Sequence, residues 1–119
     1  MTPARILIVE DSELAASALR VLFEESGYEV SIAGSVQQAV DLGMERPHDL
    51  MLLDLTLPDG DGLAVIQRLR AGGFEPRSIV ALTGHDDDEL RQRCMDAGCV
   101  DVLLKPVPIA RLLELVRSL

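Results

Sequence analysis

Short apolar runs alternate with amphipathic segments along the whole chain. The apolar runs, bounded by polar or turn residues, are typical of strands: Ile6–Val9, Val30–Ala33, Leu50–Leu53, Ile79–Leu82 and Val102–Leu104. The segments that follow them repeat apolar residues with a helical period: Leu14–Ser26, Ser35–Met44, Gly62–Arg70, Asp87–Ala97 and Pro108–Leu119. Strand–helix units joined by short links predict an α/β domain, with a parallel sheet covered by helices on both faces.

The expected helices differ in which residues should face the sheet. The inward positions, in chain order, are Ala15, Ala18 or Leu19, and Leu22; Val36, Ala39 and Val40; Leu63, Ile66 and Leu69. Ser35 is the expected N-cap of the second helix, and Pro108 suits the first turn of the last. The last helix carries an apolar stripe that fits a core face or a dimer face: Ile109, Leu112, Leu113, Val116 and Leu119. The second strand alternates apolar and polar residues, as an edge strand does.

The length and composition predict one globular domain over residues 1–119. The chain has 119 residues, 48% of them hydrophobic, which suffices for one packed core and not for two. The start at Met1, close to the first strand, leads us to expect nothing upstream. Whether an output domain follows Leu119 is left open by the sequence.

The net charge and the cysteines limit which partners and which cellular compartment we expect for this chain. A net charge of −9 argues against direct binding to nucleic acid or to an anionic membrane surface, both of which need a basic face. No signal peptide and no apolar run of membrane-spanning length is apparent, so we expect a cytoplasmic protein. The spacing of Cys94 and Cys99 matches neither a zinc site nor a redox motif, so both are expected to be small, inert, buried thiols.

Polar residues stand where four of the five predicted strands end. The first strand runs into Glu10-Asp11, the third into Asp54, the fourth into Thr83-Gly84 and the fifth into Lys105-Pro106. The carboxyl ends of parallel strands meet at one edge of a sheet, which is where open α/β sheets bind ligands. These side chains are therefore expected to converge there. The second strand ends in Ala33-Gly34-Ser35 and adds no charge.

The converging groups predict phosphoryl chemistry at a magnesium site. Two carboxylates about 5 Å apart repel by roughly 3 kcal/mol at an effective dielectric near 20, so the cluster must hold a proton or recruit a cation. Hard oxygen ligands favour Mg²⁺. Lys105 and the Thr83 hydroxyl could then neutralise a phosphoryl group carried by Asp54, because a carboxylate can act as a nucleophile toward phosphorus. The alternative is a solvated acidic rim without a ligand.

Weaker motifs receive structural interpretations. The stretch Asp59–Gly62 resembles the start of a calcium loop, but Leu63 stands where a ligand is needed, so a turn before a helix is expected. The acidic run Asp86–Glu89 is expected to cap a helix. His48 is isolated, and His85 is expected on the surface, although it lies close to Thr83.

Taken together, the motifs resemble the receiver domain of bacterial response regulators. The resemblance spans residues 6–119 and rests on these segments in order: Glu10-Asp11, Gly27–Val30, Leu52–Leu55 with Pro58 and Gly60–Gly62, Thr83-Gly84, Asp96–Gly98 and Lys105-Pro106. It implies the flavodoxin-like receiver fold, with strand order 2-1-3-4-5. It also implies a signalling switch rather than a turnover enzyme, and a histidine kinase or histidine phosphotransfer protein as the phosphoryl donor.

The resemblance also implies roles for individual residues. Asp54 would accept the phosphoryl group, while Lys105 and Thr83 would contact its oxygens. Mg²⁺ would be bound by Glu10, Asp11 and Asp54 and by the backbone carbonyl of Thr56. Thr56 and His85 occupy positions that flank the attacking water during dephosphorylation. The Lys105-Pro106 peptide bond would be cis, and an output domain, an effector protein or a second copy would read the state of the switch.

Val102 departs from the family pattern, because receivers usually carry Tyr or Phe three residues before the lysine. That ring normally carries the signal to the output surface. An alternative is therefore a receiver-fold interaction module that signals without phosphorylation. A phosphatase of the haloacid dehalogenase type is disfavoured, because such enzymes need a second Asp two residues after the nucleophile, where this chain has Thr56.

Overall fold

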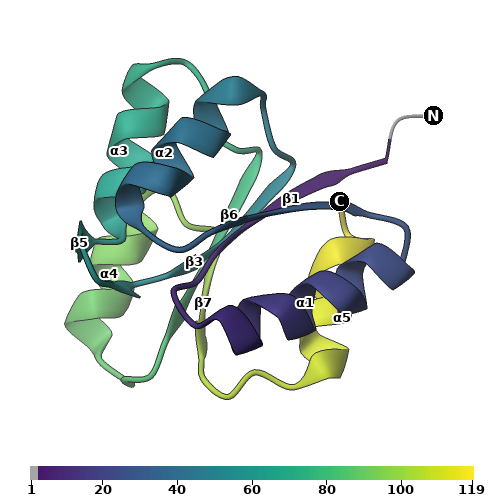
Figure 1. Cartoon of the computed structure of the whole chain (residues 1–119). Helices are drawn as coiled ribbons and strands as arrows, with labels where there is room; N and C mark the ends of the chain where they lie inside the picture. Colours follow the sequence, from purple (N-terminus) through teal and green to yellow (C-terminus); the bar gives the residue numbers. More distant parts are fainter. Residues whose placement is uncertain (1–2) are drawn as a thin grey trace.

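A five-stranded parallel sheet forms the centre of the molecule (Figure 1). In this computed structural model, which describes residues 3–119, the strand order is β2-β1-β3-β6-β7. The strands are β1 (Arg5–Val9), β2 (Glu29–Ala33), β3 (Leu50–Asp54), β6 (Ser78–Thr83) and β7 (Asp101–Leu104). This arrangement confirms the predicted order 2-1-3-4-5 and the edge position of the second strand. Met1 and Thr2, part of the stretch searched for a signal peptide, lie outside the described residues.

Helices cover the sheet on both faces. Those on one face are α2 (Val36–Glu45), α3 (Leu63–Ala71) and α4 (Asp88–Ala97), and those on the other are α1 (Glu13–Glu25) and α5 (Ile109–Arg117) (Figure 1). Successive strand residues point to opposite faces, so Leu7 and Val9 pack under α2 and α3, whereas Ile6 and Ile8 pack under α1 and α5. Burial on both faces explains why the central strands are continuously apolar.

Helix starts follow the capping residues in the sequence. Ser35 accepts a hydrogen bond from the Gln38 amide and begins α2, as predicted. Asp87 does the same for α4, which confirms that the acidic run caps a helix. Pro108 is the N-cap of α5 rather than part of its first turn, and that helix ends at Arg117.

The inward face of α1 differs in part from the prediction. Ala16 and Phe23 are the buried residues of this helix, whereas Ala15 is only half-buried and Ala18 is exposed. The predicted inward residues Leu19 and Leu22 are partly buried and pack against the core. The error has a physical cause: apolar residues cover more than half of the circumference of α1, so their spacing does not single out which of them is most buried. The inward residues of α2 and α3 are buried as predicted.

The apolar stripe of α5 is divided between core and surface. Leu112 and Val116 are buried, whereas Ile109 is 63% exposed and Leu119 is 44% exposed beyond the end of the helix. The core interpretation is therefore correct for the middle of the stripe. Among the described residues, no helix has the length and apolar character needed to cross a membrane.

A short antiparallel hairpin, which the sequence analysis did not predict, follows β3. It pairs β4 (Thr56–Leu57) with β5 (Gly60–Asp61) and turns at Pro58 and Asp59. Gly60 has φ +152°, a backbone region that favours glycine. Asp61 then accepts a hydrogen bond from the Leu63 amide at 2.9 Å, so the hairpin leads directly into α3. The turn interpretation of this acidic stretch is confirmed.

Candidate functional site

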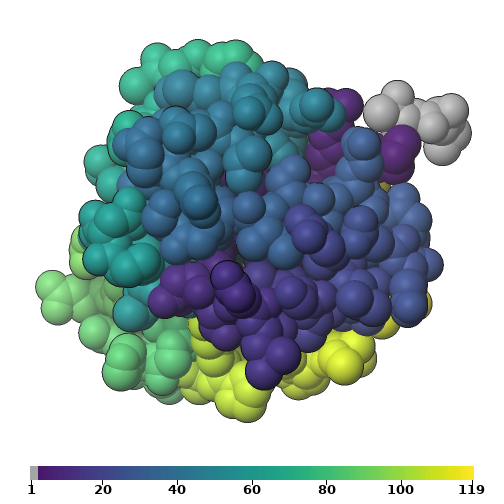
Figure 2. Space-filling model, in the orientation of Figure 1, coloured from purple at the N-terminus to yellow at the C-terminus, as the bar shows by residue number. Residues whose placement is uncertain are grey.

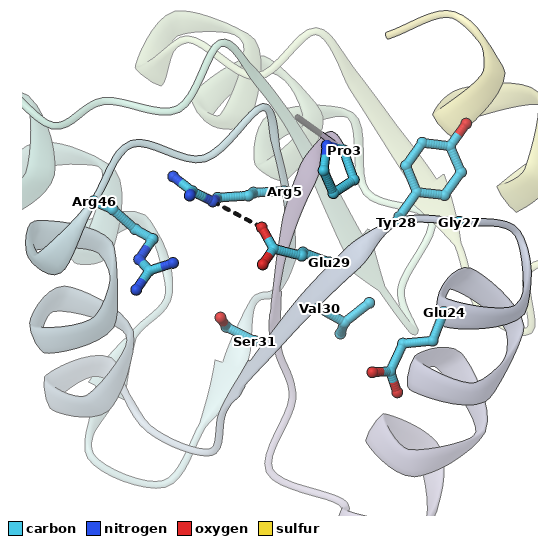
Figure 3. Close-up of a pocket in the computed structure, with 9 residues that line it drawn as sticks. All are labelled: Pro3, Arg5, Glu24, Gly27, Tyr28, Glu29, Val30, Ser31 and Arg46. Carbon is cyan, nitrogen blue, oxygen red and sulfur yellow. Dashed lines mark hydrogen bonds and ion pairs between the residues drawn. The ribbon is translucent and has the colours of Figure 1, made fainter. Parts of the chain in front are cut away.

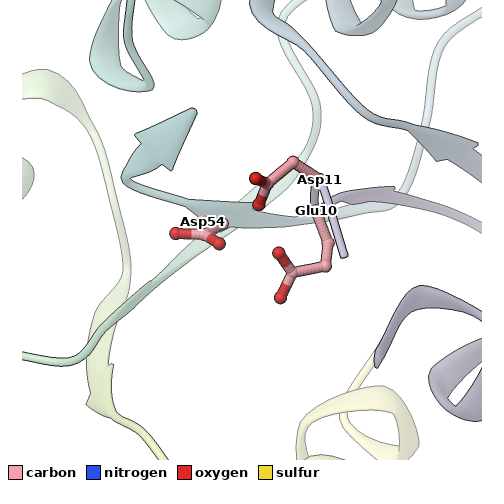
Figure 4. Close-up of side chains that lie close together, drawn as sticks. All are labelled: Glu10, Asp11 and Asp54. Atoms are coloured by element: carbon pink, nitrogen blue, oxygen red, sulfur yellow. The ribbon is translucent and has the colours of Figure 1, made fainter. Parts of the chain in front are cut away.

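Three carboxylates meet at the carboxyl edge of the sheet (Figure 4). Asp54 is the last residue of β3, and Glu10 and Asp11 follow the adjacent strand β1. One ligand oxygen from each carboxylate lies within 4.8 Å of the others. Asp54 is 5% exposed and Glu10 is 9% exposed, whereas Asp11 faces solvent. The predicted convergence of these three residues is confirmed.

Lys105 brings a positive charge to this cluster from beyond β7. Its Nζ lies 3.0 Å from Asp54 Oδ2 and 3.2 Å from Glu10 Oε1. The side chain is about one-third exposed, so it reaches the carboxylates from the solvent side of the edge. The cis Lys105-Pro106 peptide that the resemblance implied is present.

Backbone amides hold the two buried carboxylates in place. The Thr56 amide donates to Asp54 Oδ1 at 2.8 Å, and the Ser12 amide donates to Glu10 Oε2 at 3.3 Å. The chain also passes very close to Asp54 at Gly62, where an added Cβ would lie 2.7 Å from the Asp54 carbonyl oxygen. A glycine is therefore required at this position.

The charged neighbours shift the pKa values of these groups in opposite directions. Burial raises the pKa of Glu10, and its interaction with Asp54 raises it further, against the opposing effect of Lys105. Burial alone would also raise the pKa of Asp54, but interactions with Glu10, the Thr56 amide and Lys105 together lower it. Burial works against the charge of Lys105, yet its two carboxylate partners raise its pKa. Asp54 is thus held as a carboxylate beside an ammonium.

Thr83 lies at the same edge, where it ends β6. It is buried, and its Oγ1 accepts a hydrogen bond from the His85 amide at 3.1 Å. The Thr83 carbonyl accepts a hydrogen bond from the Lys105 amide at 2.7 Å, which joins the end of β6 to the segment that follows β7. His85 is exposed, as predicted. Contact of the Thr83 hydroxyl with a group on Asp54 stays a prediction.

An apolar groove of about 570 Å³ opens directly beside the charged site. Glu10 and Lys105 form its polar end. The remaining walls come from α1, the end of β6, and the connection into α5: Ala15, Ala18, Leu19, Leu22, Leu82, Pro106, Val107, Ile109 and Leu112. Leu19 and Leu22, which the sequence analysis assigned to the core, pack against it with one side and line this groove with the other.

Another hollow, of about 480 Å³, lies at the opposite end of the sheet (Figure 3). Both positively and negatively charged side chains line it, and Arg5 Nε contacts Glu29 Oε2 at 3.0 Å. The described residues that line it form no cluster of converging carboxylates. The chemistry suggested by the sequence is therefore at the carboxyl edge and not here. The lining residues are Pro3, Arg5, Glu24, Gly27, Tyr28, Glu29, Val30, Ser31 and Arg46.

The sequence analysis missed one residue that positions the hairpin after Asp54. Asp59, in the hairpin after Asp54, accepts hydrogen bonds from the Val36 amide at 2.8 Å and from the Gln37 amide at 3.2 Å. These bonds lower the pKa of Asp59 and join the hairpin to the first turn of α2. The only signal in the sequence is general, because every helix start has amides that need acceptors.

Comparison with known proteins gives a consistent result. Residues 6–117 match the family model of the response regulator receiver domain. The response regulator MprA of Mycolicibacterium vanbaalenii is 37% identical over 118 residues, which are 98% of this chain and 50% of that protein. The chain therefore spans about half the length of this relative. The polar-differentiation response regulator DivK of Brucella anthropi is 35% identical over 117 residues, covering 98% of this chain and 95% of that protein.

A solved structure of a similar fold contains a metal ion. The receiver domain of sensor histidine kinase PA1611 from Pseudomonas aeruginosa is 29% identical, with a TM-score of 0.86 and coverage of 98% of this chain and 97% of that one. That structure has a magnesium ion coordinated in its active site cleft. The present chain has a closely similar fold, and its acidic cluster lies at the carboxyl edge of the sheet.

Proposed function

Because the chain belongs to the response regulator receiver domain family, we propose that it accepts a phosphoryl group on Asp54 and switches conformation in response. One observation carries this proposal: the Lys105 ammonium contacts two carboxylates of a cluster of three at the carboxyl edge of the sheet. The cluster thus has more negative charge than its one cation balances. Such a site suits a divalent cation, which together with Lys105 would offset the negative charge of a phosphoryl group on Asp54.

The donor set fits Mg²⁺. Glu10, Asp11 and Asp54 offer hard oxygen atoms within 4.8 Å of one another, and among the residues that the structure describes no soft sulfur or imidazole ligand belongs to the cluster. We assign these three residues, with the backbone carbonyl of Thr56, as the residues that would hold the ion. When bound, Mg²⁺ supplies positive charge that lowers the repulsion between the Asp54 carboxylate and an incoming phosphoryl group.

The residues of the chain position and neutralise the transferred group. An oxygen of the Asp54 carboxylate attacks phosphorus, the bond from phosphorus to the donor histidine nitrogen breaks, and the imidazole leaves with the bonding electrons. Lys105 is already within 3.0 Å of Asp54, so it is placed to contact the oxygens of the phosphoryl group. The Thr83 hydroxyl would contact another of these oxygens. Little more is needed, because phosphoryl transfer depends mainly on positioning and charge neutralisation.

The groove beside the site gives the donor a place to dock. It runs from Glu10 and Lys105 along α1 and the start of α5, so a helix lying in it would place its own side chains next to Asp54. Leu14 is 84% exposed and Ile109 is 63% exposed on the two elements that form the groove. We propose that a helix carrying the phosphohistidine of a histidine kinase or phosphotransfer protein occupies it.

The proposal is tested by labelling the chain with a small-molecule donor, acetyl phosphate or phosphoramidate, in the presence of Mg²⁺. The wild type is expected to gain one phosphoryl group, detected by intact mass, and the Asp54→Asn variant none. Asp88→Asn is the matched control, because Asp88 is an exposed aspartate in the first turn of α4. Normal labelling of Asp54→Asn would refute Asp54 as the acceptor.

A second candidate function follows from Val102, which is 3% exposed and has no aromatic ring to move. In that case the chain would be an interaction module whose output does not depend on phosphorylation. Beryllofluoride, which mimics a phosphoryl group on aspartate, separates the two functions. Altered amide hydrogen exchange in α4 and β7 on addition of beryllofluoride supports the switch, and unchanged exchange supports the interaction module.

A further inference from the structure

The turn at the end of α4 brings the two cysteines of the chain together. Gly98 has φ +112° and reverses the chain after Ala97. The Cys99 amide then donates to the Cys94 carbonyl at 3.0 Å, and the Gly98 amide donates to the Met95 carbonyl at 3.1 Å. This pair of bonds defines a Schellman motif, in which the helix ends at a residue with left-handed backbone conformation. In this motif the side chains at the positions of Cys94 and Cys99 lie in contact.

The backbone geometry places the two residues within reach of a disulfide bond. The 3.0 Å hydrogen bond and standard bond lengths keep the two Cα atoms no more than about 7 Å apart, close to the upper limit for a disulfide. Both side chains are buried in the same apolar cluster, and both thiols are free. Burial, together with the neighbouring Cys94 thiol, raises the pKa of Cys99 to about 12. The closed turn therefore protects the pair.

We propose that Cys94 and Cys99 form an oxidation site, in which a low-molecular-weight disulfide converts the two thiols into an intrachain disulfide across the end of α4. The proposal does not depend on phosphorylation of Asp54. The structure confirms that both thiols are free and buried, as expected. The proposal departs only from the expectation that they are inert, because sequence spacing did not reveal their contact through the turn.

The reaction balances as two thiol–disulfide exchanges. The Cys99 thiol, the less deeply buried of the two, loses its proton and attacks one sulfur of the small disulfide, which releases a small thiolate and leaves a mixed disulfide on the chain. The Cys94 thiol then loses its proton and attacks the Cys99 sulfur, which releases the second small thiolate. The two cysteines lose two electrons and two protons, and the small disulfide gains them as two thiols.

The position of α4 gives the oxidant a route to the pair. Within α4, which the structure describes completely, Cys94 is the one fully buried residue, and the helix lies at the outer margin of the molecule (Figure 2). The turn itself is covered by Arg70, whose guanidinium donates to the Ala97 carbonyl at 2.6 Å and to Glu75 at 2.7 Å. A Cβ on Gly98 would lie 2.6 Å from that guanidinium. Displacement of Arg70 would therefore uncover the turn, and we infer that this opening limits the reaction.

The test uses dithiobis(nitrobenzoate), an aromatic disulfide whose released thiolate is coloured. The folded wild-type chain is expected to release two equivalents per chain, retain no adduct, and end as a monomer lighter by two hydrogen atoms. The Cys94→Ala and Cys99→Ala variants are each expected to release one equivalent and to retain one adduct. Alanine suits these sites because it is small and apolar, and either variant alone suffices if the other does not fold.

Arg70→Leu is expected to increase the rate of release several-fold, whereas Arg68→Leu is the matched control, because Arg68 contacts Gln37 and not the turn. Two results would overturn the proposal. One is a wild-type chain that retains two adducts without forming the internal disulfide. The other is a folded chain that releases nothing while the chain unfolded in guanidinium chloride reacts fully.

Discussion

The two ends of the sheet differ in how their charged side chains are paired. At the amino end, Arg5 pairs with Glu29 at 3.0 Å, and its amide donates to Asp49 at 2.8 Å. At the carboxyl end, three carboxylates share one close ammonium within the described part of the chain, that of Lys105. Opposite charges are matched at the first end and unmatched at the second.

The difference teaches where function is to be sought in this fold. Matched, partly exposed ion pairs add little to the free energy of unfolding and have no need of a further ligand. Clustered carboxylates that are largely buried destabilise the folded state unless a proton or a cation joins them. The chain keeps this unfavourable arrangement at the edge where parallel sheets bind ligands, which is typical of a functional site.

The largest expected effect comes from removing the shared cation at the carboxyl end. Lys105→Met should lower the rate of Mg²⁺-dependent labelling by phosphoramidate about 10²-fold, the usual effect of losing one preorganised electrostatic partner. Arg77→Met is the control, since Arg77 is an exposed cation near the amino end, 3.8 Å from Asp49. Equal rates of labelling for Lys105→Met and Arg77→Met would contradict the role given to Lys105.

A smaller effect is expected on stability when Mg²⁺ is added. At ten times its dissociation constant, a ligand that binds only the folded chain raises the free energy of unfolding by about 1.4 kcal/mol. Urea unfolding with Mg²⁺ and with a chelator should show this gain in the wild type and a reduced gain in Asp11→Asn. Glu29→Gln, at the amino end, should keep the full gain. Loss of the gain in Glu29→Gln would mean that Mg²⁺ binds at the other end of the sheet.

The smallest expected effect concerns His48, at the amino end, which is buried and whose Nε2 has no hydrogen-bond partner among residues 3–119. Burial lowers its pKa, with a further contribution from the charge of Arg5; the charge of Arg46 acts in the same direction, and the Arg46 backbone and Asp49 act against it. The unfolded chain therefore binds the extra proton more readily. The contribution of neutral His48 to the free energy of unfolding should be fully present above pH 6.5, the ordinary pKa of histidine. This contribution should be lost as the pH drops from there toward the lower pKa of the folded state.

His48→Gln isolates this contribution, because glutamine does not titrate in this range. Urea unfolding at a series of pH values should show a weaker loss of stability below pH 6.5 for the variant than for the wild type. Identical pH dependence of the two proteins would mean that His48 does not remain neutral in the folded chain.

Much of the fold could be predicted from local patterns. The apolar strands, the Ser35 cap and the inward residues of α2 and α3 follow from alternation, spacing and capping, which depend on residues close in sequence. The buried face of α1 followed only in part, because apolar residues cover more than half of the helix and only the neighbouring elements select Ala16 and Phe23 as its most buried residues. The hairpin after Asp54 was also missed, since strands this short leave little pattern in the sequence.

The candidate site divides in the same way. The sequence identified Glu10, Asp11, Asp54 and Lys105 because each follows the end of a predicted strand, and parallel strands bring their ends together. It could not show that Asp59 caps α2, because that contact joins residues from different loops. Nor could it show that the Thr83 hydroxyl accepts from the His85 amide in this state.

The sequence by itself determined the family, the order of the elements and the residue types at the edge of the sheet, because these depend on periodicity and on position relative to strand ends. The tertiary structure decided which groups touch: Lys105 with Asp54 and Glu10, and Cys99 with Cys94 through the turn at Gly98. The physical reason is one of range. Periodicity and capping act within a few residues, whereas charge pairing, burial and thiol contact depend on distances that only the packed chain defines.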